Sequence, residues 1–200
     1  MGIPTLFFKW NLSVPDKNQG LISIARKIDH FTDIAGNIVA WMIVPMILSL
    51  AYEVVARYAF GAPTIWAYDM TFMLYGAFFM LGSSYTLKIK GHIRTDMFYD
   101  NWPPRKQALV DLTCYVLLFY PFALIFTIVG WEYFYKAFTS DERFVSSPWM
   151  AITWPFKLTL PLTGFLLCIQ GASEVCKCIV AIRSNHWPIN TKKQEAIHNG

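Results

Sequence analysis

The sequence predicts an all-α integral membrane protein with four transmembrane helices. Of its 200 residues, 55% are hydrophobic and only 15% are charged, and the mean hydropathy is +0.36. A soluble globular domain has about 25% charged and about 45–50% apolar residues. Long uncharged segments bounded by ionisable residues also recur along the chain. These two observations place most of the chain in a lipid bilayer and leave no room for a sizeable soluble domain.

Four uncharged segments have the length of a membrane span. They lie between Asp33 and Glu53, Asp69 and Lys88, Asp111 and Glu132, and Lys157 and Glu174. A span needs about 20 mainly apolar residues, and the fourth segment fits if the polar residues at its end reach outward to the membrane surface. We expect a transmembrane domain over 34–182, with helices at about 34–58, 65–88, 104–138 and 151–182. Prolines inside the first, third and fourth helices should each produce a kink: they are Pro45, Pro121 and Pro161.

The segment before the first span has the pattern of an amphipathic helix. Apolar residues from Leu21 to Ala35 recur at the spacing of one helix face, and the charged residues at positions 26, 27, 29 and 33 lie off that stripe. We expect an interfacial helix at about 21–33, within an N-terminal segment 1–33. The same pattern also fits a simple extension of the first transmembrane helix.

Lysine and arginine are distributed unequally between the two sides of the predicted membrane domain. Thirteen of the 17 lie in the N-terminal segment, the loop between the second and third helices, and the C-terminal end. The other side has only Arg57, Lys136, Arg143 and Lys157. Because basic residues collect on the cytoplasmic side, we expect both termini to be cytoplasmic, with 183–200 as a tail. This distribution accounts for the net charge of +4, and we expect no nucleic-acid partner.

A polar cluster is predicted at the outer end of the first two helices. Glu53 and Arg57 are four residues apart and share a helix face. After the tight turn at 61–63, Asp69 enters the second helix at a depth similar to that of Glu53. Arg57 is therefore expected to bridge to one or both carboxylates, in a helix–helix or subunit contact. The alternative is that all three side chains simply extend to the membrane surface.

The inner loop between the second and third helices carries a second polar segment. In GHIRTD at 91–96, Gly91 suits a helix end and Asp96 suits the cap of a following short helix. His92 alone points to a structural hydrogen bond, and Arg94 lies beside it. Basic residues around this loop are candidates for contacts with anionic lipid head groups: Lys88, Lys90, Arg105 and Lys106.

Enzyme chemistry is not expected from this sequence. The four histidines lie at or beyond the cytoplasmic helix ends, which disfavours a haem-binding membrane anchor of a redox complex. The closest cysteines, Cys176 and Cys178, have one intervening residue where a redox motif has two. We expect neither a cofactor nor a metal site. An independent four-helix carrier or channel stays open as an alternative, although the spans offer only a thin polar face.

Three motifs taken in order resemble one transporter family. YEVVARY at 52–58, GAPTIW at 61–66 and GHIRTD at 91–96, followed by WPPR at 102–105, are similar to the small membrane subunit of tripartite ATP-independent periplasmic (TRAP) transporters. The resemblance covers roughly residues 35–115, and the four-span plan extends it to about 182. It departs from the family where an acidic pair often follows the tryptophan, because here Trp66 is followed only by Asp69.

The resemblance implies a scaffold subunit in a bacterial inner membrane. In this family, a large membrane subunit carries the substrate and sodium sites and moves as an elevator, and a periplasmic binding protein delivers an organic acid. The small subunit anchors the large one and offers its outer surface to the binding protein. Expected partners are these two proteins and membrane lipids. The candidate structural or subunit-interface residues are Glu53, Arg57, Trp66, Asp69, Gly91, His92, Arg94 and Asp96.

Overall fold

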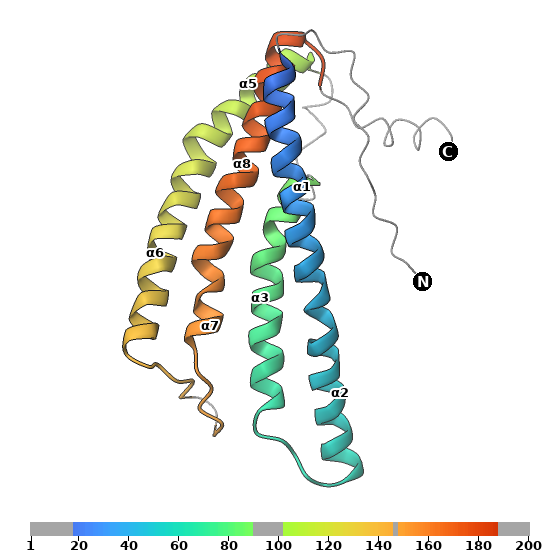
Figure 1. Ribbon diagram of the computed structural model, residues 1–200, viewed down its shortest axis with the longest axis vertical. Coiled ribbons are helices and arrows are strands. Elements are labelled where there is room, and N and C mark those ends of the chain that lie inside the picture. Colours follow the sequence, from blue (N-terminus) through green and yellow to red (C-terminus); the bar gives the residue numbers. More distant parts are fainter. Residues whose placement is uncertain (1–17, 90–101, 146–147, 188–200) are drawn as a thin grey trace, which may run out of the picture.

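The protein is all-helical in its computed structural model, which describes residues 18–89, 102–145 and 148–187. Within those ranges there are no strands, and one isolated antiparallel bridge joins Arg143 to Ile152. The helices run up and down, so that α1 (Gln19–Trp41) begins and α8 (Thr159–Ser184) ends at the same end of the molecule (Figure 1). We call this the inner end, because the distribution of basic residues predicts that it is cytoplasmic.

The first predicted span consists of two helices in one 41-residue run, α1 and α2 (Ile43–Ala59). α1 continues from Gln19 through the whole 21–33 segment without a break. The 21–33 segment is therefore the inner half of α1 and continues into the first predicted span, and its place at a membrane interface stays a prediction. One side of this half packs into the protein through Ile22, Ala25 and Asp29, while Ile24 and Phe31 are exposed.

The remaining helices form three further passes through the molecule, and the last of them lies at its centre. α3 (Ala67–Lys88) returns from the outer turn toward the inner end. The third pass comprises α5 (Pro104–Cys114), the π-helical turn η2 (Tyr115–Phe119) and α6 (Tyr120–Thr139). After an outer loop, the short α7 (Trp154–Lys157) leads into α8.

Each of the three prolines coincides with an interruption of its helix. A proline has no N–H for the carbonyl four residues earlier and its ring crowds that carbonyl. For Pro45 and Pro161 that carbonyl belongs to Trp41 and Lys157, the last residues of α1 and α7. For Pro121 it belongs to Leu117, in the middle of η2. The prolines thus explain why three passes are each built from more than one helical piece.

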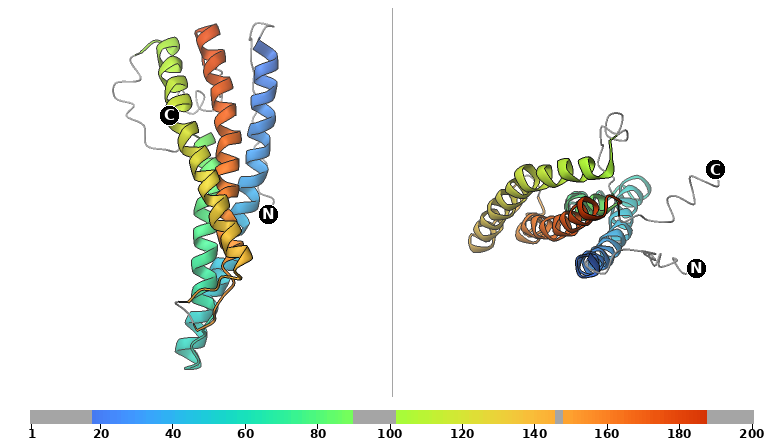
Figure 2. Two further views of the ribbon diagram at one scale, coloured as in Figure 1. Left: turned by 90° about the vertical axis from the view of Figure 1, so that its left-hand side faces the viewer. Right: turned by 90° about the horizontal axis from the view of Figure 1, so that it is seen from above.

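The centre of the fold is α8, which lies between α6 on one side and α1 and α3 on the other (Figures 1 and 2). Of the most apolar 18 residues in the α7–α8 pass, 44% are buried, against 11% in α1–α2 and 6% in α5–α6. Glycines allow this close packing. A Cβ at Gly164 would lie 3.0 Å from Cβ of Thr127 in α6, and one at Gly171 would lie 2.6 Å from Phe119.

Among the described residues, three helical passes are long and apolar enough to cross a membrane. They are Gln19–Ala59, Pro104–Thr139 and Trp154–Ser184. α3 has 22 residues but is not among them, and its tyrosine and serine content is the reason for its lower hydropathy. The fourth span and the cytoplasmic orientation of the termini stay predictions.

The contact at Gly164 gives a test of the packing. Gly164→Ala should destabilise the isolated protein in detergent by about 1–3 kcal/mol, because the added methyl overpacks the α6–α8 contact. Gly82→Ala is the matched control, since nothing lies within 4 Å of a Cβ built there. Thermal unfolding of both variants measures the difference, and equal effects would contradict this packing.

Candidate functional site

The outer turn between α2 and α3 is closed by the carboxylate of Glu53. One oxygen, Oε1, accepts hydrogen bonds from Nε and Nη2 of Arg57 at 2.9 and 2.5 Å. The other, Oε2, accepts from the backbone N–H of Thr64 at 3.0 Å and from the Thr64 hydroxyl. Both oxygens are therefore occupied, and Glu53 ties the far side of the turn to the last helical turns of α2.

Three further residues shape the same turn. Gly61 has φ of 61°, a left-handed conformation that favours glycine. The N–H of Ala62 donates to the carbonyl of Ala56 at 3.0 Å, which ends α2. Trp66 precedes α3 and stacks on Tyr52 of α2, with ring centroids 5.6 Å apart. The motif residues at 52–66 thus make local contacts that shape the turn between the two helices. We call Glu53, Arg57 and Thr64 the hairpin clamp.

Asp69 does not join the hairpin clamp. Its side chain is buried, and its Oδ2 has no hydrogen-bond partner. Gly76 lies seven residues further along α3, close to two turns, and its position faces Phe156 of α7. Asp69 therefore lies on the side of α3 that faces α7. The charge is in the first turn of α3, where the helix dipole favours an anion.

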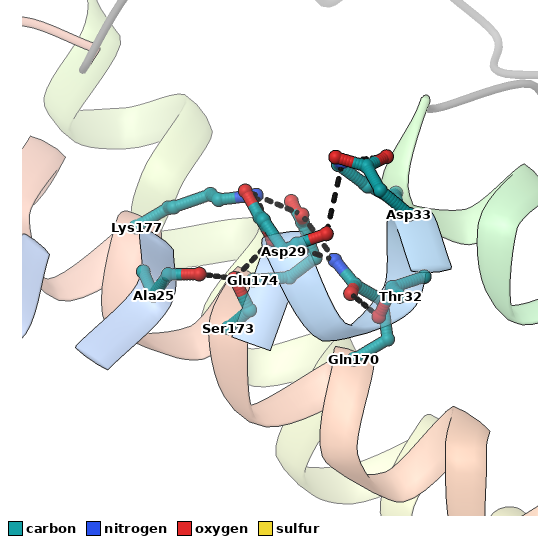
Figure 3. A network of polar contacts seen from close by, with 9 residues as sticks. Ala25, Asp29, Thr32, Asp33, Gln170, Ser173, Glu174 and Lys177 are labelled. Atoms are coloured by element: carbon teal, nitrogen blue, oxygen red, sulfur yellow. Dashed lines mark hydrogen bonds and ion pairs between the residues drawn. The ribbon is translucent and has the colours of Figure 1, made fainter. Parts of the chain in front are cut away.

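The most extensive polar contact lies at the inner end, between α1 and α8 (Figure 3). Nζ of Lys177 is 2.9 Å from Oδ2 of Asp29 and 2.6 Å from Oε1 of Glu174. All three side chains are almost completely buried. One ammonium group thus neutralises part of the charge of two carboxylates, and these three groups carry a net charge of −1.

Neutral side chains complete this α1–α8 network (Figure 3). Gln170, which is 0% exposed, donates from Nε2 to Oδ1 of Asp29 at 3.1 Å and accepts from the Thr32 hydroxyl at 2.7 Å. The Ser173 hydroxyl lies 2.7 Å from Oδ1 of Asp29. Burying charged groups is costly unless they are paired and hydrogen-bonded. The neutral partners supply those bonds and fix the register of α1 against α8.

α3 is attached to the same network through Lys88. Its Nζ donates to the carbonyl of Asp29 at 3.0 Å and forms an ion pair with Asp33. The Lys88 side chain is only 12% exposed, so little of it faces a lipid surface. Of the other head-group candidates, Arg105 and Lys106 are exposed on α5. Lys90, Gly91, His92, Arg94 and Asp96 lie outside the described residues.

Sequence analysis alone did not identify the α1–α8 network. It placed Asp29 and Asp33 on the polar face of an interfacial helix, and treated Glu174 and Lys177 as residues that reach toward the surface. The available signal was the spacing of Gln170, Glu174 and Lys177, which lie on one face of α8 at i, i+4 and i+7. A polar stripe on an otherwise apolar helix indicates a buried partner.

A comparison with known families now identifies the chain. The family model described as "Tripartite ATP-independent periplasmic transporters, DctQ component" matches residues 46–181. The chain belongs to this family. The match begins in α2 and ends in α8, so it covers the hairpin clamp and the α8 side of the α1–α8 network. No curated protein is similar enough to count as a match.

Membership of the DctQ family makes this chain the small membrane subunit of a TRAP transporter. A transporter component is not an enzyme class. In the part of the chain that the structure describes, no group of three or more potential ligands is placed to hold a metal ion. The charged groups of the α1–α8 network connect two helices, and those of the hairpin clamp connect α2 to the turn that follows it.

The α1–α8 network predicts a large effect of removing its cation. Lys177→Met should lower the free energy of unfolding by about 3–5 kcal/mol, because Asp29 and Glu174 lose the charge that compensates their burial. Arg143→Met is the control, since its 3.3 Å pair with Asp141 is exposed on both sides and worth about 0–1 kcal/mol. Denaturant unfolding in detergent measures both, and a small effect of Lys177→Met would contradict the network.

The hairpin clamp predicts a ranking of two substitutions. Glu53→Ala should lower Tm by several degrees, because it leaves both the Thr64 donors and Arg57 without their acceptor. Arg57→Ala should have a smaller effect, since Arg57 is 53% exposed and Glu53 keeps its bonds to Thr64. Thermal unfolding of the two variants checks the order, and the reverse order would show that Arg57 is the dominant member.

Proposed function

We propose that this chain is the scaffold subunit of a sodium-coupled TRAP transporter for organic acids in a bacterial inner membrane. It anchors the large, elevator-type membrane subunit and helps the periplasmic binding protein to dock. The observation that carries the proposal is the placement of charge. In every helical pass of the matched family region, the aspartate, glutamate, lysine and arginine side chains lie toward the two ends, and the middle has none.

A membrane protein that moves ions or acids needs polar groups or broken helices near the middle of the membrane. The uncharged segments of this chain, such as the one from Asp33 to Glu53, offer no charged group there. Where its helices are interrupted, the cause is a proline and not a ring of polar ligands. This supports an accessory role, in which the large subunit carries the substrate and sodium sites.

The buried polar groups at the two ends also favour a rigid scaffold. Asp29, Glu174 and Lys177 bond to one another, and Glu53 has both oxygens engaged by its own hairpin. The first set of contacts joins helices that are distant in sequence, the second closes a local turn, and both engage these charges within the chain. A subunit fixed in this way suits the stationary part of an elevator mechanism.

The outer end offers a surface that a soluble partner can reach. The loop between α6 and α7 exposes Asp141, Arg143 and Val145, and the α2–α3 turn exposes Tyr58 and Phe60. Mixed charged and aromatic groups of this kind are common at protein interfaces. This supports a docking role for the outer end.

Reconstitution tests the scaffold function. In liposomes, this chain alone should give no sodium-driven uptake of an organic acid, whereas the chain with the large subunit and binding protein should give uptake. Mild detergent extraction should recover this chain with the large subunit. Uptake by the lone chain would favour an independent carrier, and recovery without the large subunit from cells that contain it would contradict the scaffold.

A further inference from the structure

Two large surfaces of this chain are exposed, and they differ in chemistry. α6 and the helix before it form one of them, and every exposed residue between 116 and 129 is apolar. Such a surface is fully compatible with lipid chains. The other surface belongs to α1, α2 and α3 on the opposite side of α8 (Figure 1).

The second surface carries polar groups without partners. Asn37 of α1 is exposed one turn inside Asp33, and its side chain has no hydrogen-bond partner among the described residues. Tyr75 of α3 is 52% exposed, about 9 Å along the helix from Asp69, and its hydroxyl also lacks a partner within the described chain. In hydrocarbon an amide or hydroxyl without a hydrogen bond is costly. Lipid tails cannot supply that bond, but a neighbouring helix can.

Helix geometry brings these groups to one side of the α1–α3 pair. Asn37 follows Gly36, whose position contacts the ring of Tyr85. Gly82 is one turn before Tyr85, and nothing lies within 4 Å of a Cβ built there. Tyr75 precedes Gly82 by nearly two turns, so it shares the same side of α3.

This side of α3 is turned away from α8. The buried residues in the middle and at the inner end of α3 lie about a third to a half of a turn around the helix from Tyr75 and Gly82. They are Ala77, Ser84 and Leu87, and the two buried residues at the outer end of α3 are Ala67 and Asp69. We call the exposed side, defined by Asn37, Tyr75 and Gly82, the α1–α3 face.

We infer that the α1–α3 face binds a transmembrane helix of the large membrane subunit. That helix supplies hydrogen-bonding groups to Asn37 and Tyr75 and approaches closely over Gly82. Small residues at a membrane interface let two backbones come together, and polar side chains there bond across it. The inference rests on the proposed scaffold function, because that function supplies a membrane partner.

The other surface does not have these features between 116 and 129, although α6 exposes Tyr133 and Tyr135 nearer its outer end. All the other glycines in the helical membrane passes between 30 and 180 already face another part of this chain, as at Gly36, Gly76, Gly130, Gly164 and Gly171. Gly82 is the exception, with open space above it. The α6 surface therefore has neither an open glycine in its described helix nor an exposed unpartnered polar group between 116 and 129, and this part of it suits contact with lipid chains.

Site-specific photo-crosslinking in native membranes tests the assignment. A benzophenone amino acid at Trp41, beside Asn37 on α1, and one at Tyr75 should each crosslink to the large subunit. The same group at Phe122, exposed on α6, should not. Crosslinks to the large subunit only from Phe122, crosslinks to a second copy of this chain, or no protein crosslinks from Trp41 and Tyr75 in an intact complex would each overturn the inference.

A substitution tests the unpaired amide directly. Asn37→Leu should lower recovery of the complex about threefold, because it removes a hydrogen bond between helices. Ile38→Leu, at the next exposed position, should leave recovery unchanged. An unchanged or higher recovery with Asn37→Leu would show that Asn37 faces lipid. Failure to recover any complex with the unmodified chain would instead contradict the scaffold function itself.

Discussion

The ammonium group of Lys177 holds together the inner half of this protein. It is the cation shared by Asp29 of α1 and Glu174 of α8, at a place where little water reaches any of the three. The arrangement of α1 depends on it, since the 23-residue α1 has no other ion pair to α8 within the described chain. Lys88 then connects the end of α3 to the same turn of α1. Three helices from distant parts of the sequence are thus brought into register by one group of charges.

The two polar sites differ in how much the sequence reveals of them. The hairpin clamp is local: Glu53, Arg57 and Thr64 lie within 12 positions, and helix periodicity alone predicts the Glu53–Arg57 contact. Asp69, which the sequence placed in the same cluster, lies on the side of α3 that faces α7. Helix periodicity relates Asp69 to Gly76, but only the structure shows that Gly76 faces α7. The α1–α8 network joins residues about 140 positions apart. No local spacing predicts which distant helix a polar stripe will meet.

The packing partners of the glycines also could not be predicted from the sequence. A small residue in an apolar helix indicates close packing, but the sequence does not say against what. A side chain of this same protein lies over each of four glycines, which are Gly36, Gly76, Gly164 and Gly171. Residue type and spacing did predict the all-helical class and the interruption of three helices at prolines. They did not predict the central position of α8, because the hydropathy of its pass does not set it apart from the other long apolar passes, and only the tertiary packing does.

The paired charges also set how the molecule sits in a bilayer. Asp33 and Glu53 are about 30 Å apart along their helices, and Asp69 and Lys88 nearly as far, which is the thickness of a hydrocarbon core. The 41-residue run of α1 and α2, about 60 Å long, would need a tilt of about 60° to fit inside that core, beyond the 0–40° seen for membrane helices. Its inner third is therefore expected to extend beyond the hydrocarbon core. Since Asp33 and Lys88 are bonded to each other, neither can shift alone when the membrane thickens or thins. The helices of the subunit therefore keep one common depth in the bilayer. When the bilayer thickness changes, the subunit must tilt or the surrounding lipid must deform.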